Sequence, residues 1–203
     1  ATPIISSQYR ARIQADLVDY RYDPRVDHNN VTLKWLLVVK DHFTKFSWIR
    51  TLRSKEAKLV AAEITRLFCE IGWPLIFHHD NGSEFIAKVV RDILEGEPLV
   101  CTVTGQPRKP TDQGSVERLN QEVKKVMDHE IMMAKERGVE DPSWVDLIPQ
   151  TTVTMNNTVS YGNNQLTPYQ HVYGMDYDCP IITMPLGDMA KLKTVADLAA
   201  YAQ

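Results

Sequence analysis

One stretch decides the interpretation of this chain: Pro107-Arg108-Lys109-Pro110-Thr111-Asp112-Gln113-Gly114-Ser115-Val116-Glu117-Arg118-Leu119-Asn120. Its first half predicts a basic loop, because two prolines interrupt any regular hydrogen-bond ladder and Gly114 permits backbone angles closed to other residues. From Ser115 on, apolar residues recur at helical spacing, at Val116, Leu119, Val123 and Val126 or Met127. This spacing predicts a helix from Ser115 to about Arg137 whose apolar stripe packs inward.

The other face of this predicted helix carries Glu117, Asn120, Gln121, Lys124 and Asp128. A carboxylate, amides and a lysine on one face, just after a basic loop, favour a metal-dependent site that acts on a phosphate backbone. The simpler interpretation is a capped amphipathic helix with a solvated polar face. Matching carboxylates elsewhere in the chain are needed to favour the first interpretation.

Composition limits the class of protein. The 203 residues, 43% of them hydrophobic, suffice for one domain of about 150–170 residues plus a tail. The net charge of −3 is unlike that of a typical DNA-binding domain, so a DNA-binding role would rest on local patches or on further parts of a longer protein. Cys69, Cys101 and Cys179 lack metal-site spacing and predict buried thiols in a reducing compartment. The absence of a membrane-spanning run and of a secretory pattern leads us to expect a cytosolic or nuclear protein without a membrane partner.

Hydrophobic periodicity divides the chain into strands and helices. We predict strands at 13–20, 33–40, 43–52, 75–79 and 99–103, and helices at 54–71 (with Ser54 as its N-cap), 83–94, 115–137, 144–157 and 167–174. The first three strands should form an antiparallel meander, and the polar stretch 21–30 an exposed connection. The order predicts an α/β fold, a five-stranded mixed sheet with helices on both faces. Residues 189–202 have helical character but no predicted place.

Three carboxylates occupy equivalent places in this arrangement. Asp16 lies within the first predicted strand, Asp80 follows the fourth, and Glu117 lies on the first turn of the helix after the fifth. Ligands bind at the carboxyl ends of strands in such sheets. Three oxygen ligands without cysteine favour Mg²⁺ or Mn²⁺ over zinc. Two such ions, about 3.5–4 Å apart, can serve phosphoryl transfer, with Asp16 bridging both and the other two carboxylates holding one each.

Other side chains compete for these roles. Asp19 is the nearest alternative ligand, and we expect it on the same face of the strand as Asp16. Asp16 could instead pair with an arginine, and Asp41 is interpreted as a turn residue. The adjacent His78 and His79 should point to opposite faces of the sheet, which favours a core or supporting role for one of them over a histidine metal site.

The sequence around the three carboxylates resembles the catalytic core of retroviral and retrotransposon integrases. The matching motifs are Gln14-Ala15-Asp16-Leu17-Val18-Asp19, His79-Asp80-Asn81-Gly82-Ser83-Glu84-Phe85 and Gln113-Gly114-Ser115-Val116-Glu117-Arg118-Leu119-Asn120. Asp41-His42-Phe43-Thr44-Lys45-Phe46 resembles the hairpin between the second and third strands, and Thr167-Pro168-Tyr169 with Tyr173-Gly174 resembles the end of retrotransposon cores. The resemblance covers about residues 10–175. We therefore assign residues 1–178 to the core and leave 179–203 as a tail or the start of a following segment.

The resemblance implies a ribonuclease-H-like fold with Asp16, Asp80 and Glu117 as catalytic and metal-binding residues, and with two Mg²⁺ or Mn²⁺ ions. It implies that Asn81 and Gly82 shape the turn that holds Asp80, with Gly114 in a supporting role. Residues expected at DNA are Arg108, Lys109, Gln113, Asn120, Gln121 and Lys124.

Family members process the 3′ ends of an element's DNA and join them to target DNA. The expected partners are therefore element-end DNA, target DNA and a second copy of the chain, in a homodimer within a larger nucleoprotein assembly. The expected place is the nucleus, after a cytoplasmic stage if the chain is part of a retroelement particle.

The chain departs from the retroviral pattern in four places. The gap from Asp80 to Glu117 is slightly long, the connection at 21–30 is extended, Gln121 stands where lysine is common, and Asp112 adds an acidic residue to the loop. None removes a metal ligand. Two alternatives stay open: a domesticated host protein that uses the core for binding or oligomerisation without catalysis, and a cut-and-paste transposase or nuclease of the same fold.

Overall fold

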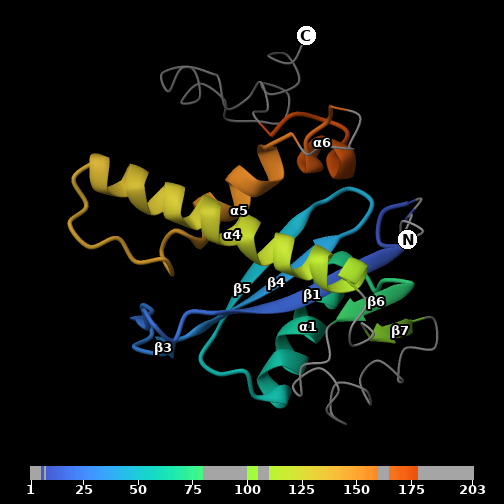
Figure 1. Ribbon diagram of the computed structural model, residues 1–203, viewed down its shortest axis with the longest axis horizontal. Helices are drawn as coiled ribbons and strands as arrows, with labels where there is room; N and C mark the ends of the chain where they lie inside the picture. The colour runs from blue at the N-terminus through green and yellow to red at the C-terminus, as the bar shows by residue number, and fades with distance from the viewer. Residues whose placement is uncertain (1–5, 7, 80–99, 105–109, 160–164, 178–203) are drawn as a thin grey trace, which may run out of the picture.

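The computed structural model describes residue 6 and residues 8–79, 100–104, 110–159 and 165–177, with the backbone alone for residues 104 and 110–117. Figure 1 shows a sheet with α1 on one side and α4, α5 and α6 on the other. This arrangement confirms the predicted α/β fold with helices on both faces of a mixed sheet. In chain order the described elements are β1 (Arg12–Asp19), β2 (Arg25–Val26), β3 (Thr32–Leu33), β4 (Trp35–Asp41), β5 (Ser47–Leu52), α1 (Ala57–Ile71), β6 (Ile76–His79), β7 (Cys101–Thr104), α4 (Pro110–Glu136), α5 (Ile148–Asn157) and α6 (Pro168–Tyr173).

The central strand of the main sheet is β1. The described strands lie in the order β5-β4-β1-β6-β7. β1, β4 and β5 form the predicted antiparallel meander, whereas β6 runs parallel to β1, and β7 parallel to β6. Helix α1 carries the chain from the edge strand β5 to β6, on the other side of β1. The chain order therefore reverses at β1, and such a reversal is where open α/β sheets bind ligands.

The two faces of the sheet follow from the alternation of side chains along β1. Ile13 and Ala15 pack in the core under α1, whose buried residues are Val60, Ala61, Ile64, Leu67 and Phe68. Val18 belongs to the second core, which α4 covers with Leu119, Val123 and Met127. Gln14 and Asp16 alternate with the first set and therefore lie on the α4 side. The fold thus places a buried carboxylate beneath α4.

Several predicted boundaries differ from the structure. Helix α4 begins at Pro110, not Ser115, so that Gly114 lies inside the helix and Glu117 lies beyond its first turn. Proline suits the first helical position, because an N–H there would have no partner within the helix. Helix α5 begins at Ile148, since the chain from Trp144 forms a turn first. Both differences arise because apolar spacing predicts a helical face better than it predicts the residue at which a helix starts.

Three further expectations were wrong or incomplete. Ser54 does not cap α1, because its hydroxyl accepts from the N–H of Glu56, which precedes the helix. Cys69 and Cys101 are exposed, not buried, since Cys69 lies outside the buried stripe of α1 and Cys101 lies on an edge strand. The polar connection after β1 contains a short antiparallel pair, β2 and β3. Helix α6 matches the prediction, with a capping box between Thr167 and Gln170 and an end at Gly174. Residues 83–94 and 189–202 lie outside the described residues.

Candidate active site

Asp16 is a carboxylate buried in the middle of the sheet. It lies at the centre of β1 opposite Val38, and only 4% of its surface is exposed. Its Oδ1 accepts from the N–H of Leu17 at 2.8 Å, and its Oδ2 accepts from the side-chain Nδ2 of Asn120 at 2.5 Å. A buried carboxylate is costly unless its oxygens have partners. Asp16 is therefore fixed in position by its own strand and by helix α4.

Helix α4 brings its polar face to this carboxylate. Leu119 and Val123 are buried against the sheet, which fixes the rotation of the helix, and Asn120 lies between them beside Asp16. The backbone of Glu117 is three residues before Asn120, one helical turn along the same side of the helix. The predicted proximity of Glu117 to Asp16 is consistent with this backbone, and the side chain of Glu117 lies outside the described residues.

The remaining predicted carboxylate is Asp80. Strand β6 ends at His79, which pairs with Ala15 of β1, the residue before Asp16. Asp80 is the next residue in the chain and lies outside the described residues, as do Asn81, Gly82, Arg108 and Lys109. Gln113 and Gly114 are described only through the backbone of α4. Their assigned roles stay predictions.

The structure argues against Asp19, the alternative metal ligand on β1. Asp19 does not share its face, because three residues along a strand lead to the opposite side, and the expectation of a shared face was wrong. Asp19 instead pairs with Arg21 at 2.7 Å, and the hydrogen bond from Arg21 is the main cause that lowers the pKa of Asp19.

Asp41 is the last residue of β4, and its side chain holds the turn that follows, in agreement with the predicted turn at Asp41-His42. Its fully buried carboxylate accepts from the backbone N–H groups of Arg10, Phe43 and Thr44 and from the Thr44 hydroxyl. His78 pairs with Gln14 and His79 with Ala15, so the two histidines face opposite sides of the sheet, as predicted, and both are buried.

Comparison with solved structures identifies this arrangement of strands and helices. The HTLV-2 integrase catalytic core domain in complex with magnesium (trimeric form) has a TM-score of 0.61 at 17% identity, over 80% of this chain and 95% of that chain. The catalytic core domain of BIV integrase has a TM-score of 0.58 at 20% identity, over 81% of this chain and 95% of that chain. This chain has the fold of retroviral integrase catalytic cores.

Sequence comparison finds both foamy-virus polyproteins and a human protein. The chain is 24% identical over 156 residues to the Pro-Pol polyprotein of simian foamy virus type 3 (strain LK3), and this match covers 77% of this chain and 13% of that protein. It is 34% identical over 94 residues to human KRAB-A domain-containing protein 2, which covers 46% of this chain and 19% of that protein. The chain therefore spans less than a fifth of the length of these curated relatives. No protein-family model matches it.

A polar cluster beside Asp16 was missed in the sequence. In this integrase-core fold, Gln14 lies two residues before Asp16 on the same face, and its Oε1 accepts from Nε2 of His42 at 3.0 Å. Arg12 Nη2 lies 3.1 Å from Nδ1 of His78. Burial lowers the pKa of His42 to about 3, with a smaller contribution from Arg12, so the His42 imidazole is neutral near pH 7. The sequence signal that could have revealed this cluster is the position of Gln14, which is two residues before Asp16 and therefore on the same face of the strand.

The candidate DNA contacts on α4 divide into two kinds. Asn120 is half-buried and holds Asp16, while its Oδ1 is buried without a hydrogen-bond partner among the described residues. Gln121 and Lys124 are exposed. Glu122, between them, pairs with Lys40 of β4 at 2.6 Å, which further ties the helix to the sheet. The exposed pair lies where an approaching ligand could reach it.

The described donors, the Asp16 carboxylate and the Asn120 amide oxygen, suit a hard divalent cation. Mg²⁺ and Mn²⁺ prefer carboxylate and amide oxygens. The Asp16 carboxylate is buried beside the Asn120 amide, whose unpartnered Oδ1 is a second oxygen at the same place. Within the described ranges no group of three His, Cys, Asp or Glu side chains could hold a metal ion. The predicted set has two further members, Asp80 and the Glu117 side chain, and both fall outside those ranges.

Proposed function

We propose that this chain is the catalytic core of an integrase, which processes the 3′ ends of an element's DNA and joins them to target DNA. The observation that carries the proposal is Asp16, a buried carboxylate at the strand-order reversal that contacts α4 one turn from Glu117. The similarity in fold to integrase cores and in sequence to Pro-Pol polyproteins supports it.

In this proposal Asp16, Asp80 and Glu117 hold two Mg²⁺ or Mn²⁺ ions. When bound, such ions activate an attacking oxygen and stabilise a leaving oxygen at phosphorus. Asn120 positions Asp16 through its Oδ2, and Leu17 N–H fixes the other oxygen. We expect Gln121 and Lys124, on the exposed side of α4, to contact DNA near the site. The similar HTLV-2 core is in complex with magnesium, which supports this choice of metal.

Partners and location follow from the same proposal. One similar structure is an intasome of simian T-cell lymphotropic virus, with a TM-score of 0.64 at 17% identity, over 84% of this chain and 56% of that chain. The HTLV-2 core is described in dimeric and trimeric forms. We infer that this chain forms a homodimer within a larger assembly with element-end and target DNA, and that it acts in the nucleus. Among the described residues, no helix is long and apolar enough to cross a membrane.

The test is a disintegration assay with branched DNA oligonucleotides and Mg²⁺ or Mn²⁺, because this reaction demands least of a core fragment. We expect product from the chain, and none from Glu117→Gln or Asp80→Asn, with unchanged circular dichroism and thermal unfolding. Each change keeps side-chain size but removes a metal-binding charge. Product that persists in Glu117→Gln would remove Glu117 from the mechanism. Glu136→Gln is the matched control, since it makes the same carboxylate-to-amide change at the exposed far end of α4 and leaves Asp16, Asp80 and Glu117 intact.

A second candidate function is supported by the human relative. KRAB-A domain-containing protein 2 is a host protein, and its identity to this chain is higher than that of the Pro-Pol polyprotein, although over a shorter match. A host-derived chain could keep the core as a binding or oligomerisation module. This function would be favoured if the folded chain binds DNA or dimerises but yields no disintegration product, either alone or within its full-length protein.

A further inference from the structure

One tyrosine beside the candidate active site is exposed and yet held firmly. Tyr22 follows β1, and 71% of its surface is exposed, more than that of any other large hydrophobic side chain among the described residues. Its ring stacks on Tyr20, with 5.5 Å between the centroids and 25° between the planes. Tyr20 is buried and packs on the fully buried Trp144 at 4.7 Å. One face of Tyr22 is therefore supported by the core.

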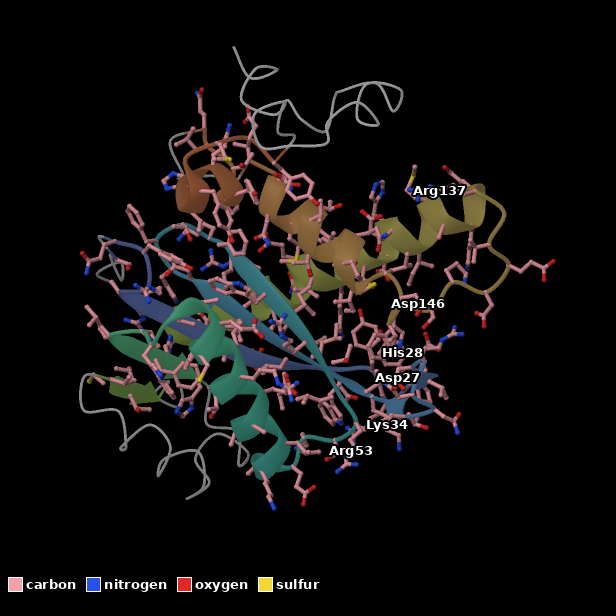
Figure 2. All side chains as sticks on the ribbon, turned by 180° about the vertical axis from the view of Figure 1, so that it is seen from behind. Asp27, His28, Lys34, Arg53, Arg137 and Asp146 are labelled. Atoms are coloured by element: carbon pink, nitrogen blue, oxygen red, sulfur yellow. The ribbon has the colours of Figure 1, made fainter. Side chains whose placement is uncertain are left out.

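The segment that carries Tyr22 is braced from the α4–α5 connection. The indole N–H of Trp144 donates to the carbonyl of Asp23 at 2.7 Å. Arg25 donates two hydrogen bonds to the Asp141 carboxylate and also pairs with Asp23. In Figure 2 the labels Asp27 and His28 mark this segment, and the label Asp146 marks the connection. These contacts order the backbone around Tyr22, so its side chain need not be ordered when a ligand arrives.

Lys124 connects this tyrosine to the candidate active site. Its Nζ lies 6.0 Å from the centre of the Tyr22 ring. Lys124 is four residues after Asn120 on α4, a rise of about 6 Å along the same side of the helix. Since Asn120 touches Asp16, the pair of Tyr22 and Lys124 lies one helical turn from the carboxylate.

The local charge favours contact with a base over contact with phosphate. Asp19 pairs with Arg21, whereas Asp23 and Asp141 share the single positive charge of Arg25. Asp128 remains close enough to raise the pKa of Tyr22, although burial is the larger cause. With Lys124 counted, these groups are four carboxylates and three cationic side chains, so the surface around Tyr22 carries a slight negative excess and does not attract phosphate. An aromatic ring that stacks on a base needs no strong positive field, because every base has a π face.

We propose that Tyr22 and Lys124 form a platform on which an unpaired DNA base stacks, next to the strand end that the site acts on. The platform rests on the proposed function for the identity of that strand, but stacking itself requires neither metal nor catalysis. The extended connection after β1, one of the departures from the retroviral pattern, supplies the tyrosine.

The test uses a duplex whose short single-stranded overhang carries 2-aminopurine, in metal-free buffer. Stacking on a ring quenches this base, so we expect binding of the wild-type chain to quench it. Tyr22→Ala should abolish the quenching and weaken overhang binding by about 5- to 150-fold, whereas Tyr22→Phe, which keeps the ring, should retain both. Binding to a blunt duplex should not change.

The matched control is Tyr173→Ala. Tyr173 is also exposed but lies on α6, away from the β2–β3 hairpin in Figure 1. The proposal is overturned if Tyr22→Ala leaves quenching or overhang affinity unchanged, or if Tyr173→Ala reduces them equally. It is also overturned if the wild-type chain binds the overhang without quenching it, or does not bind it. The disintegration assay fails separately if the catalytic proposal is wrong, so quenching without product would retain the platform and discard only the activity.

Discussion

The two faces of the central sheet bury different kinds of side chain, apolar ones under α1 and a mixture of polar and apolar ones under α4. Under α1, the strands contribute apolar side chains such as Ile13, Leu37 and Phe77. Under α4, the same strands contribute Asp16 and Lys40 beside Val38. Alternation along each strand produces both faces from a single run of sequence. The α1 face therefore provides stability, and the α4 face accepts buried polar groups, which natural proteins tolerate where they serve a function.

The largest effect is expected on the α1 face. Phe68→Ala should lower the free energy of unfolding by about 3–5 kcal/mol, because Phe68 is fully buried between Trp73 and Phe77 and its removal leaves a cavity. Urea denaturation measures the loss. Cys69→Ala, at the next and exposed position of α1, is the control and should change stability little. A loss under about 1 kcal/mol for Phe68→Ala would mean that the α1 face is not the main source of stability.

The next effect should appear on the α4 face as a dependence on pH. The pKa of His42 is lowered to about 3 in the folded protein, from an ordinary value near 6.5. Between these two pH values the unfolded chain binds more protons at His42 than the folded chain does. The contribution of His42 to the free energy of unfolding is therefore fully present above about pH 6.5. It falls as the pH decreases, by up to about 1.4 kcal/mol per pH unit.

His42→Gln should flatten this dependence, since glutamine can still donate to Gln14 but does not titrate. The measurement is urea denaturation at several pH values between 4.5 and 7. His28→Gln, at an exposed position, is the control and should leave the wild-type slope unchanged. An identical slope in wild type and His42→Gln would show that another group causes any loss of stability in acid.

The smallest effect on stability is expected at the carboxylate itself. Asp16→Asn keeps the shape of the side chain and one oxygen while it removes a buried charge, and the Asn120 amide can turn so that its unpartnered Oδ1 accepts from the new amide. The free energy of unfolding should therefore stay within about 1 kcal/mol of the wild-type value or rise. Disintegration activity should be lost in the same variant. Thermal unfolding and the activity assay, made on one preparation, separate the two results. A loss of more than about 2 kcal/mol would assign Asp16 to the architecture and not to the chemistry.

Much of the fold could be predicted from the sequence, because apolar spacing is a local property of the chain. It predicted the meander, the mixed sheet and the buried stripe of α1. Apolar spacing failed where cap geometry or contacts between distant parts of the chain set an element's boundary. At the start of α4, for example, the predicted basic loop ran on to Gly114, whereas the helix begins at Pro110. The predicted shared face of Asp16 and Asp19 was an error in alternation, and the strand pairing corrects it.

The sequence by itself determined that Asp16 lies in a strand and that Glu117 and Asn120 lie on one side of a helix, because the spacing of residues along regular elements sets these positions. Only the tertiary structure decided that Asn120 holds Asp16, that Gln14, His42 and His78 gather beside it, and that Tyr22 stands over Lys124. These pairs are separated in the chain by up to 104 positions, as between Asp16 and Asn120. Their contacts depend on how helices dock on the sheet, and no local pattern encodes that docking.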